Sequence, residues 1–242
     1  MKRLLASALL VLLASPAFAA DVYVKINTHS DALAVGGQSQ PARDSVAEQW
    51  YGAGKTAQTS GDVGLIVDLE KNTAYMVNHR DKSYVPIPLP MDITTVLPPE
   101  VKSMAPNLQM TATVAATAET KSIGRWQCKG YDVALTVMGM PMTLRVWAST
   151  DVPAALLDYS AKVTPVFLQG QMRLTDESVK EFAKIKGFQV ATELNADFMG
   201  ARMHTTTEVV EIAEKAAPAG TYEPPAGYAR KATLSVQDLQ RR

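Results

Sequence analysis

The stretch GLIVDLEKNTAYMVNHRDKSYVPIP, residues 64–88, decides the fold of this protein. It holds three short apolar runs, LIVDL at 65–69, TAYMVN at 73–78 and KSYVPI at 82–87. The polar groups EKN and HRD separate these runs, and polar turns of this length join neighbouring strands into hairpins. The stretch therefore predicts a meander of antiparallel strands.

Strand patterns continue on both sides of this meander. Residues 22–27, VYVKIN, alternate apolar and polar with the period of two that a half-buried strand shows. Residues 47–58 predict a strand that the glycines at 52 and 54 interrupt. Further strands are predicted over residues 110–116, 126–138, 142–149, 188–194 and 201–212. Most of the chain is therefore expected to form sheet.

Helical patterns are fewer. The Pro-rich segment at 86–101 does not fit a central strand, because proline cannot donate a ladder hydrogen bond. A short helix is predicted over 100–105, and residues 153–173 predict helix that is broken near Pro165. One more helix is predicted in TDESVKEFAKIKG, with Thr175 or Asp176 as its cap and Gly187 as its stop.

Many strands with few helices predict a mainly β fold. We expect a single antiparallel sheet, curled into a half-open barrel, with helices covering its concave side. No Gly/Ser-rich linker divides the chain, so residues 21–231 are expected to form one domain. A polar tail follows at 232–242.

The first twenty residues have the three parts of a secretory signal peptide: the basic start MKR, the apolar run LLASALLVLL and the small-residue site SPAFAA. The apolar run is shorter than the roughly 20 residues that a membrane span needs. No cysteine follows the cleavage site, so a bacterial lipid anchor is not expected. The pattern predicts a periplasmic protein that starts near Asp21.

The charge balance argues against nucleic acid as a partner. Without the signal peptide the chain has 22 basic and 24 acidic residues, which leaves no basic footprint for phosphates. After residue 20 no apolar run is long enough to cross a membrane, so no transmembrane span is expected in the mature chain. The expected partner is an apolar ligand or another envelope protein.

The only cysteine, Cys128, lies in RWQCKGYDV at 125–133. It shares a strand face with Trp126, and after Gly130 the apolar positions shift by one step, as a β-bulge would cause. A buried thiol has a raised pKa and low reactivity. We therefore interpret Cys128 as a packing residue, with no disulfide partner in the chain.

Methionine is the most suggestive residue type. Met138, Met140 and Met142 alternate in VMGMPM, and methionines recur later in the chain. Flexible thioethers suit a pocket for variable apolar shapes, a site for Cu(I), or simply an irregular core. The histidines, His29, His79 and His204, are widely separated along the chain and do not strengthen the copper reading. No metal site is predicted.

Motifs for catalysis are missing from the sequence. GAGKT at 52–56 resembles part of a phosphate-binding loop, but Gln49 stands where that pattern needs glycine. There is no G-x-S-x-G, H-E-x-x-H or Cys-x-x-Cys. The prediction is a protein that is not an enzyme, with no catalytic residues and no cofactor, although separated catalytic groups can still meet in a fold.

Four stretches together resemble an uncharacterised family of exported bacterial proteins, a domain of unknown function. They are the meander at 64–88, ETKSIGRWQCKGYDV at 119–133, MTLRVWASTDVP at 142–153 and TYEPPAGYARK at 221–231. That family is similar in layout to the LolA/LolB-like carriers of the periplasm. The resemblance implies an unclosed antiparallel barrel whose apolar side holds acyl chains, and it carries no catalytic residues to this chain.

The sequence therefore predicts a non-enzymatic periplasmic binding protein for a lipid, a lipoprotein or another apolar ligand. A cell-envelope interaction module with a filled core is the alternative, and an enzyme is a third. The expected ligand-binding residues are Trp50, Trp126, Met138, Met140, Leu144 and Trp147. A register slip of one residue would send any of them to the opposite face of its strand.

Overall fold

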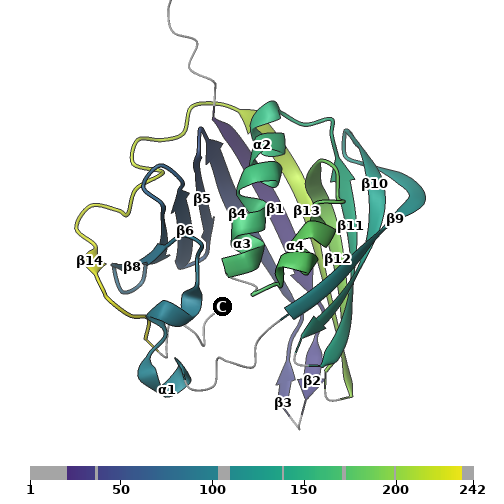
Figure 1. The fold of residues 1–242 in the computed structure, drawn as a ribbon, viewed down its shortest axis with the longest axis horizontal. Coiled ribbons are helices and arrows are strands. Elements are labelled where there is room, and N and C mark those ends of the chain that lie inside the picture. The colour runs from purple at the N-terminus through teal and green to yellow at the C-terminus, as the bar shows by residue number, and fades with distance from the viewer. Residues whose placement is uncertain are drawn as a thin grey trace, which may run out of the picture.

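The computed structural model describes residues 21–35, 38–102, 110–137, 139–170, 173–198 and 200–235 (Figure 1). Its strands are β1 (Val22–Ser30), β2 (Leu33–Val35), β3 (Gln38–Gln40), β4 (Arg43–Gly52), β5 (Lys55–Ser60), β6 (Val63–Asp68), β7 (Thr73–Asn78), β8 (Ser83–Pro88), β9 (Met110–Ile123), β10 (Trp126–Val137), β11 (Met140–Ser149), β12 (Phe188–Phe198), β13 (Ala201–Glu214) and β14 (Ala229–Arg230). Its helical elements are η1 (Ile93–Val96), α1 (Pro99–Lys102), α2 (Ala154–Lys162), α3 (Thr164–Gly170) and α4 (Asp176–Phe182).

One sheet of twelve strands dominates the fold, in the order β14-β8-β7-β6-β5-β4-β1-β13-β12-β11-β10-β9. Its neighbours pair antiparallel except β14, which runs parallel to β8. The prediction of a mainly β fold with one antiparallel sheet is confirmed. The sheet is open, as predicted, because its hydrogen-bonded order ends at β14 and β9, but it is not strongly curled, so the half-barrel shape is not confirmed.

The meander is confirmed as β6, β7 and β8, whose tight turns place Asn72 and Lys82 at positive φ. The neighbouring prediction was wrong in one respect. Residues 47–58 are not one interrupted strand, because the chain turns at Gly54, where φ is +67°, and β4 and β5 pair as a hairpin. Glycine takes positive φ at no steric cost, so here it reverses the chain rather than weakening a strand.

The helix predictions hold in outline. The Thr175 hydroxyl accepts a hydrogen bond from the Ser178 amide, which makes Thr175 the cap of α4. The break near Pro165 is confirmed, because α2 ends at Lys162 and α3 begins at Thr164. Two ends differ: α4 stops at Phe182, before Gly187, and residues 103–105 of the first predicted helix lie outside the described residues.

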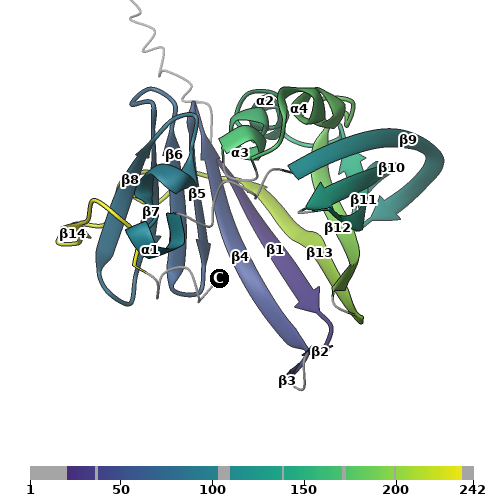
Figure 2. The same ribbon diagram turned by 60° about the horizontal axis from the view of Figure 1, so that its bottom comes forward.

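Helices α2, α3 and α4 lie on one side of the sheet, which we call the helix face (Figures 1 and 2). Leu156 of α2 is fully buried in a core cluster with Val22, Tyr51 and Phe188 of three strands. The Tyr51 ring meets Tyr159 of α2 edge to face, with 4.6 Å between ring centroids. Burial of these large apolar groups is what fixes the helices to the sheet.

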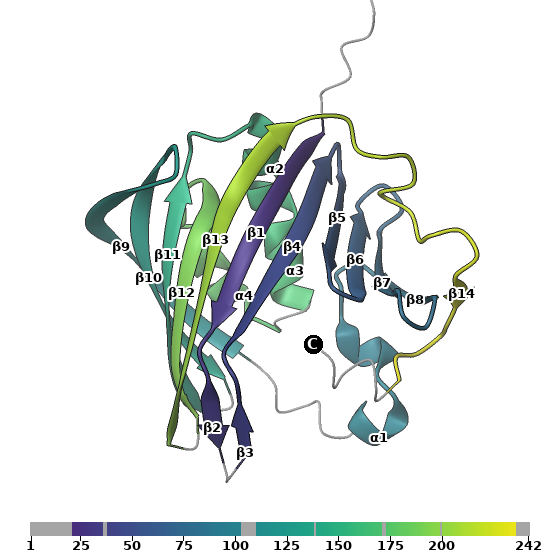
Figure 3. The same ribbon diagram turned by 180° about the vertical axis from the view of Figure 1, so that it is seen from behind.

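The opposite side, the outer face, is covered in part by the chain that follows β13 (Figure 3). Tyr222 and Tyr228 of this segment pack on a small cluster that includes Trp50 and Tyr75. The chain then forms β14 beside β8. Leu234, within the predicted polar tail, is buried, and its amide donates to the Val96 carbonyl; residues 236–242 lie outside the described part.

Edge strand β9 is capped by α4 over its first residues. The Ala112 amide donates to the Ser178 hydroxyl at 2.8 Å, and the Val114 amide donates to a Glu181 carboxylate oxygen at 2.9 Å. Hydrogen bonds to Lys184 and to the Val114 amide lower the pKa of Glu181. These contacts occupy amides that would otherwise be open to strand pairing with another chain.

The interpretation of Cys128 as packing is confirmed. Its side chain is 1% exposed in the cluster that holds Leu156, and burial raises the pKa of the thiol. The predicted irregularity at Gly130 is also present, because the register between β9 and β10 shifts between Lys129 and Tyr131. The extra residues lie on β9, so the bulge belongs to the partner strand.

Candidate functional site

Strand β4 turns polar side chains toward the helices. Tyr51 lies on the helix face, and strand alternation places Gln49, Ser45 and Arg43 on the same side. Val46 points the other way and is 47% exposed. Arg43 and Ser45 therefore lie on the side where a closed core would need apolar residues, which indicates that this part of the helix face is not closed core.

Adjoining cavities lie between α2 and α3 and this part of the sheet. We call three of them the groove, because Gln58 and Phe167 line all three. The deep chamber has a volume of about 310 Å³, the mouth chamber about 460 Å³ and the slit between strands and helices about 20 Å³. Beyond the mouth, a wider vestibule of about 850 Å³ shares Arg43, Ser45 and Ser60 with the mouth chamber.

The groove changes character along its length. Aromatic and aliphatic side chains dominate the deep chamber, among them Tyr51, Tyr159, Phe167, Phe182, Phe188 and Val190. The mouth chamber has both apolar and polar lining residues. The apolar ones include Leu65, Met76 and Phe167, and the polar ones include Ser30, Ser45, Ser60 and Arg43. A lining that combines apolar and aromatic side chains with some polar groups is typical of small-molecule sites.

The two tyrosines of the deep chamber stay neutral. Burial raises the pKa of Tyr159 to about 12, and burial raises the pKa of Tyr51 as well. The Tyr51 hydroxyl donates a hydrogen bond to the Gln49 side-chain oxygen, so Gln49 links the deep chamber to the polar row of β4. The described residues that line this chamber are all uncharged, and they contribute apolar, aromatic, amide and hydroxyl groups.

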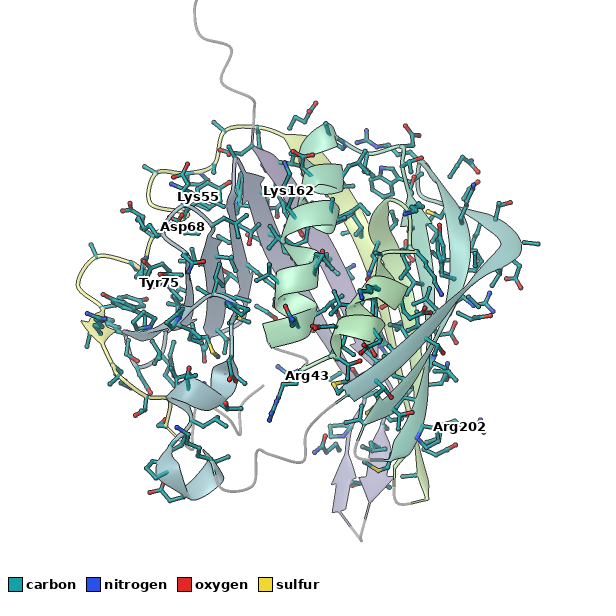
Figure 4. The ribbon with its side chains drawn as sticks, in the orientation of Figure 1. Arg43, Lys55, Asp68, Tyr75, Lys162 and Arg202 are labelled. Atoms are coloured by element: carbon teal, nitrogen blue, oxygen red, sulfur yellow. The ribbon has the colours of Figure 1, made fainter. Side chains whose placement is uncertain are left out.

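Arg43 lies where the mouth chamber meets the vestibule. Figure 4 shows its side chain between α3 and the segment that carries α1. It is exposed, and it is the only charged residue that lines the mouth chamber among the described residues. In the vestibule the other charged groups are Asp62 and Arg80, which pair with each other at 2.8 Å.

The residues predicted from sequence to bind the ligand are not brought together. Trp50 lies on the outer face, with its ring 5.0 Å from that of Tyr23. Trp126 is buried in the core beside Cys128 and also borders a shallow surface hollow. Leu144 packs under α4, and Trp147 lies at Gly130 with two cations near its ring.

Two further methionine positions complete that comparison. Met140 is partly exposed at the start of β11, and Met138 lies outside the described residues. None of the five described residues is among those that line the groove. The sequence pattern favoured large apolar residues. The groove differs from closed core by the polar residues that line it beside its apolar ones.

Two histidines that are distant in sequence meet through Asp31. One Asp31 carboxylate oxygen lies 3.2 Å from His29 Nε2, and the other lies 3.0 Å from His204 Nδ1. Asp44 and Glu193 contact the remaining ring nitrogens at 2.7 and 3.3 Å. The described residues contain no group of three or more acidic, histidine or cysteine side chains placed to hold a metal ion, so we interpret this cluster as a tie between strands.

This histidine–carboxylate cluster predicts that the stability of the protein depends on pH. The hydrogen bond that the His29 ring donates to the Asp44 carboxylate raises the pKa of His29, with Asp31 adding to the effect. A raised folded-state pKa contributes stability that is full below the unfolded pKa, near 6.5, and is lost as pH rises through the folded value. The stability difference between the native protein and a His29→Gln variant is therefore expected to be larger near pH 5.5, below the unfolded pKa, than at about pH 9.

Urea unfolding at both pH values measures this difference. Nuclear magnetic resonance titration of the His29 ring should also show a lower pKa in an Asp44→Asn variant. Asp158→Asn, which removes an exposed carboxylate that pairs with Lys162 on α2, is the control and should leave the titration unchanged. A His29 titration that ignores the loss of Asp44 would contradict the assignment.

Comparison with known families gives one match. The family described as "Domain of unknown function (DUF4412)" matches residues 48–228, from the middle of β4 to the segment on the outer face. Comparison with curated proteins gives no match. In the described part of the chain no helix combines the length and apolar character needed to cross a membrane. Because the family match covers well over half of the chain, this protein belongs to the DUF4412 family of domains of unknown function.

Proposed function

We propose that this protein is a non-enzymatic binding protein that holds the apolar part of a lipid, a lipoprotein or a similar molecule in the groove. The observation that carries the proposal is the lining of the groove, in which aromatic side chains gather around Tyr159 and the one charged side chain among the described lining residues, Arg43, lies at the mouth. The chamber volumes fall within the several hundred Å³ that small-molecule sites occupy. Burial of a hydrocarbon chain contributes about 0.8 kcal/mol per methylene, so binding needs no catalytic group.

The signal-like first twenty residues support a periplasmic location for this activity. An open antiparallel sheet with helices on one face also supports the resemblance to LolA/LolB-like carriers, which act in that compartment. We include both in the proposal. The protein would then shield an apolar molecule from water between two membranes.

The distribution of apolar surface favours a carrier over an interaction module. Among the described residues, only Val46 and Val210 are exposed large hydrophobic residues on the surface. A docking surface would instead need a contiguous apolar patch. Partly exposed Leu65 and Phe167 face the groove, which places accessible apolar area inside the molecule.

The test uses two tryptophan variants of one strand. Gln58 lines every chamber of the groove, whereas Thr59 is its neighbour on the outer face of β5 and is exposed. We expect Gln58→Trp to weaken binding of the neutral dye N-phenylnaphthylamine by about tenfold or more, which corresponds to about 1.4 kcal/mol. Thr59→Trp should bind the dye as the native protein does. Circular dichroism and thermal unfolding would establish that both variants are folded.

Native mass spectrometry of protein purified without detergent provides the second readout. A stoichiometric lipid mass in the native protein, reduced in Gln58→Trp, would support the proposal. A bare protein mass that does not change after incubation with envelope lipids, together with no dye binding, would refute it.

A further inference from the structure

Charge along the groove is confined to one position. The deep chamber and the slit are lined by uncharged residues, and Arg43 is the single charged residue of the mouth chamber in the described chain. No ion pair of Arg43 is found among the described side chains, whereas the other vestibule charges, Asp62 and Arg80, neutralise each other. The groove therefore ends in a positive charge that no acidic side chain among the described residues pairs with.

Hydroxyl groups surround the approach to this charge. Ser30 is the direct cross-strand partner of Arg43, and Ser45 follows it on the same face of β4. Ser60 of β5 lines both the mouth chamber and the vestibule. A guanidinium with hydroxyl donors beside it suits an oxyanion, because charge-assisted hydrogen bonds to such groups are stronger than neutral ones.

We propose that the ligand of the groove is a single-chain anionic amphiphile, with its acidic end group at Arg43 and its hydrocarbon chain directed past Phe167 toward Tyr159. This inference rests on the proposed function and specifies its ligand class. A neutral ligand would leave the charge of Arg43 unused, and a cationic ligand would be repelled by it. The uncharged chamber beyond Phe167 takes the chain, since nothing there pairs with a second charge.

The experiment compares laurate with dodecanol, which have chains of equal length and differ in the charge of the end group. Each compound competes with N-phenylnaphthylamine for binding to the full-length protein at low salt, where an exposed ion pair is least screened. We expect laurate to compete about tenfold more strongly than dodecanol, in line with a hydrogen bond to a charged group. Dodecyl phosphate should behave as laurate does, because the site recognises the negative charge and its oxygen atoms.

Arg43→Gln should remove this preference, so that laurate and dodecanol compete with the dye to within about twofold of each other. Arg43→Lys should retain part of it, because the charge stays while the planar fork of donors is lost. Arg202→Gln is the matched control: Arg202 is also exposed, but it lies on the hairpin of β12 and β13, away from the groove (Figure 4). It should keep the full preference.

The outcomes separate this inference from the proposed function. If the native protein binds the dye but laurate and dodecanol compete equally, or if Arg43→Gln keeps the preference for laurate, the anionic ligand is refuted and the groove remains an apolar site. Displacement of the dye by inorganic phosphate alone would also overturn the inference, because it would show an anion site that needs no chain. If the native protein binds neither the dye nor the chains, the proposed function itself fails.

Discussion

Replacing Leu156 with alanine is expected to lower the free energy of unfolding by about 2–5 kcal/mol. Leu156 has no exposed surface and lies where α2 meets the strands on the helix face. Alanine would remove buried methyl groups and leave a cavity that the surrounding strands cannot fill, because they are held by their ladders. The same change would loosen α2, which carries Tyr159 into the groove.

Leu157 offers a matched control on the same helix. It follows Leu156 directly and is partly exposed, so Leu157→Ala removes the same atoms from a site that solvent already reaches. We expect it to cost less than half as much as Leu156→Ala. Urea unfolding followed by tryptophan fluorescence measures both changes, since Trp126 belongs to the same core cluster as Leu156. Equal losses in the two variants would contradict the assignment of Leu156 as the anchor of α2.

The local structure of this protein follows closely from its sequence. The meander could be predicted because its turns, EKN and HRD, stand between runs whose alternation has a single reading. Thr175 could be recognised as a helix cap because a hydroxyl before an acidic first turn is a signal confined to a few residues. Such signals depend on neighbours in the chain, and here they hold in the structure.

The arrangement of the sheet was harder to predict. A hairpin between β4 and β5 and a strand interrupted by glycines share one sequence, and only the pairing of Trp50 with Ala57 decides between them. Whether the sheet closes depends on whether β9 pairs with β14, and no local sequence pattern indicates this pairing. A curled half-barrel was therefore a reasonable expectation from strand number alone, and the open sheet is set by contacts between distant segments.

The groove was missed for a related reason. Alternation in β4 separates Ser45 and Gln49 from Val46 and Trp50, but it does not tell which set faces the helices. Hydrophobicity suggested that the apolar set points inward, and the structure places it outward. A partial signal was present all the same, because three of the four residues on one face between positions 43 and 49 are polar: Arg43, Ser45 and Gln49. Whether Trp50 or Leu144 ever contacts a ligand stays a prediction.

Replacing Gly187 with alanine is expected to be the most damaging change in a glycine of this fold. Gly187 joins the end of α4 to β12 with φ at +101°, and a Cβ atom there would lie 2.3 Å from the Ser149 carbonyl oxygen. Strain at positive φ and a clash with backbone add, so the free energy of unfolding should fall by roughly 2–6 kcal/mol. The end of β11, where Ser149 pairs with Phe188, would have to move.

Gly220→Ala isolates the first of these two effects. Gly220 has φ of +82°, and nothing lies within 4 Å of the position its Cβ would take. Its replacement should cost only about 1–2 kcal/mol, because the backbone strain is present without the clash. Urea unfolding of the two variants at one and the same pH gives the difference directly, because both variants keep His29. Equal losses would mean that the contact between Gly187 and Ser149 yields easily, and that the turn into β12 tolerates a side chain which the structure leaves no room for.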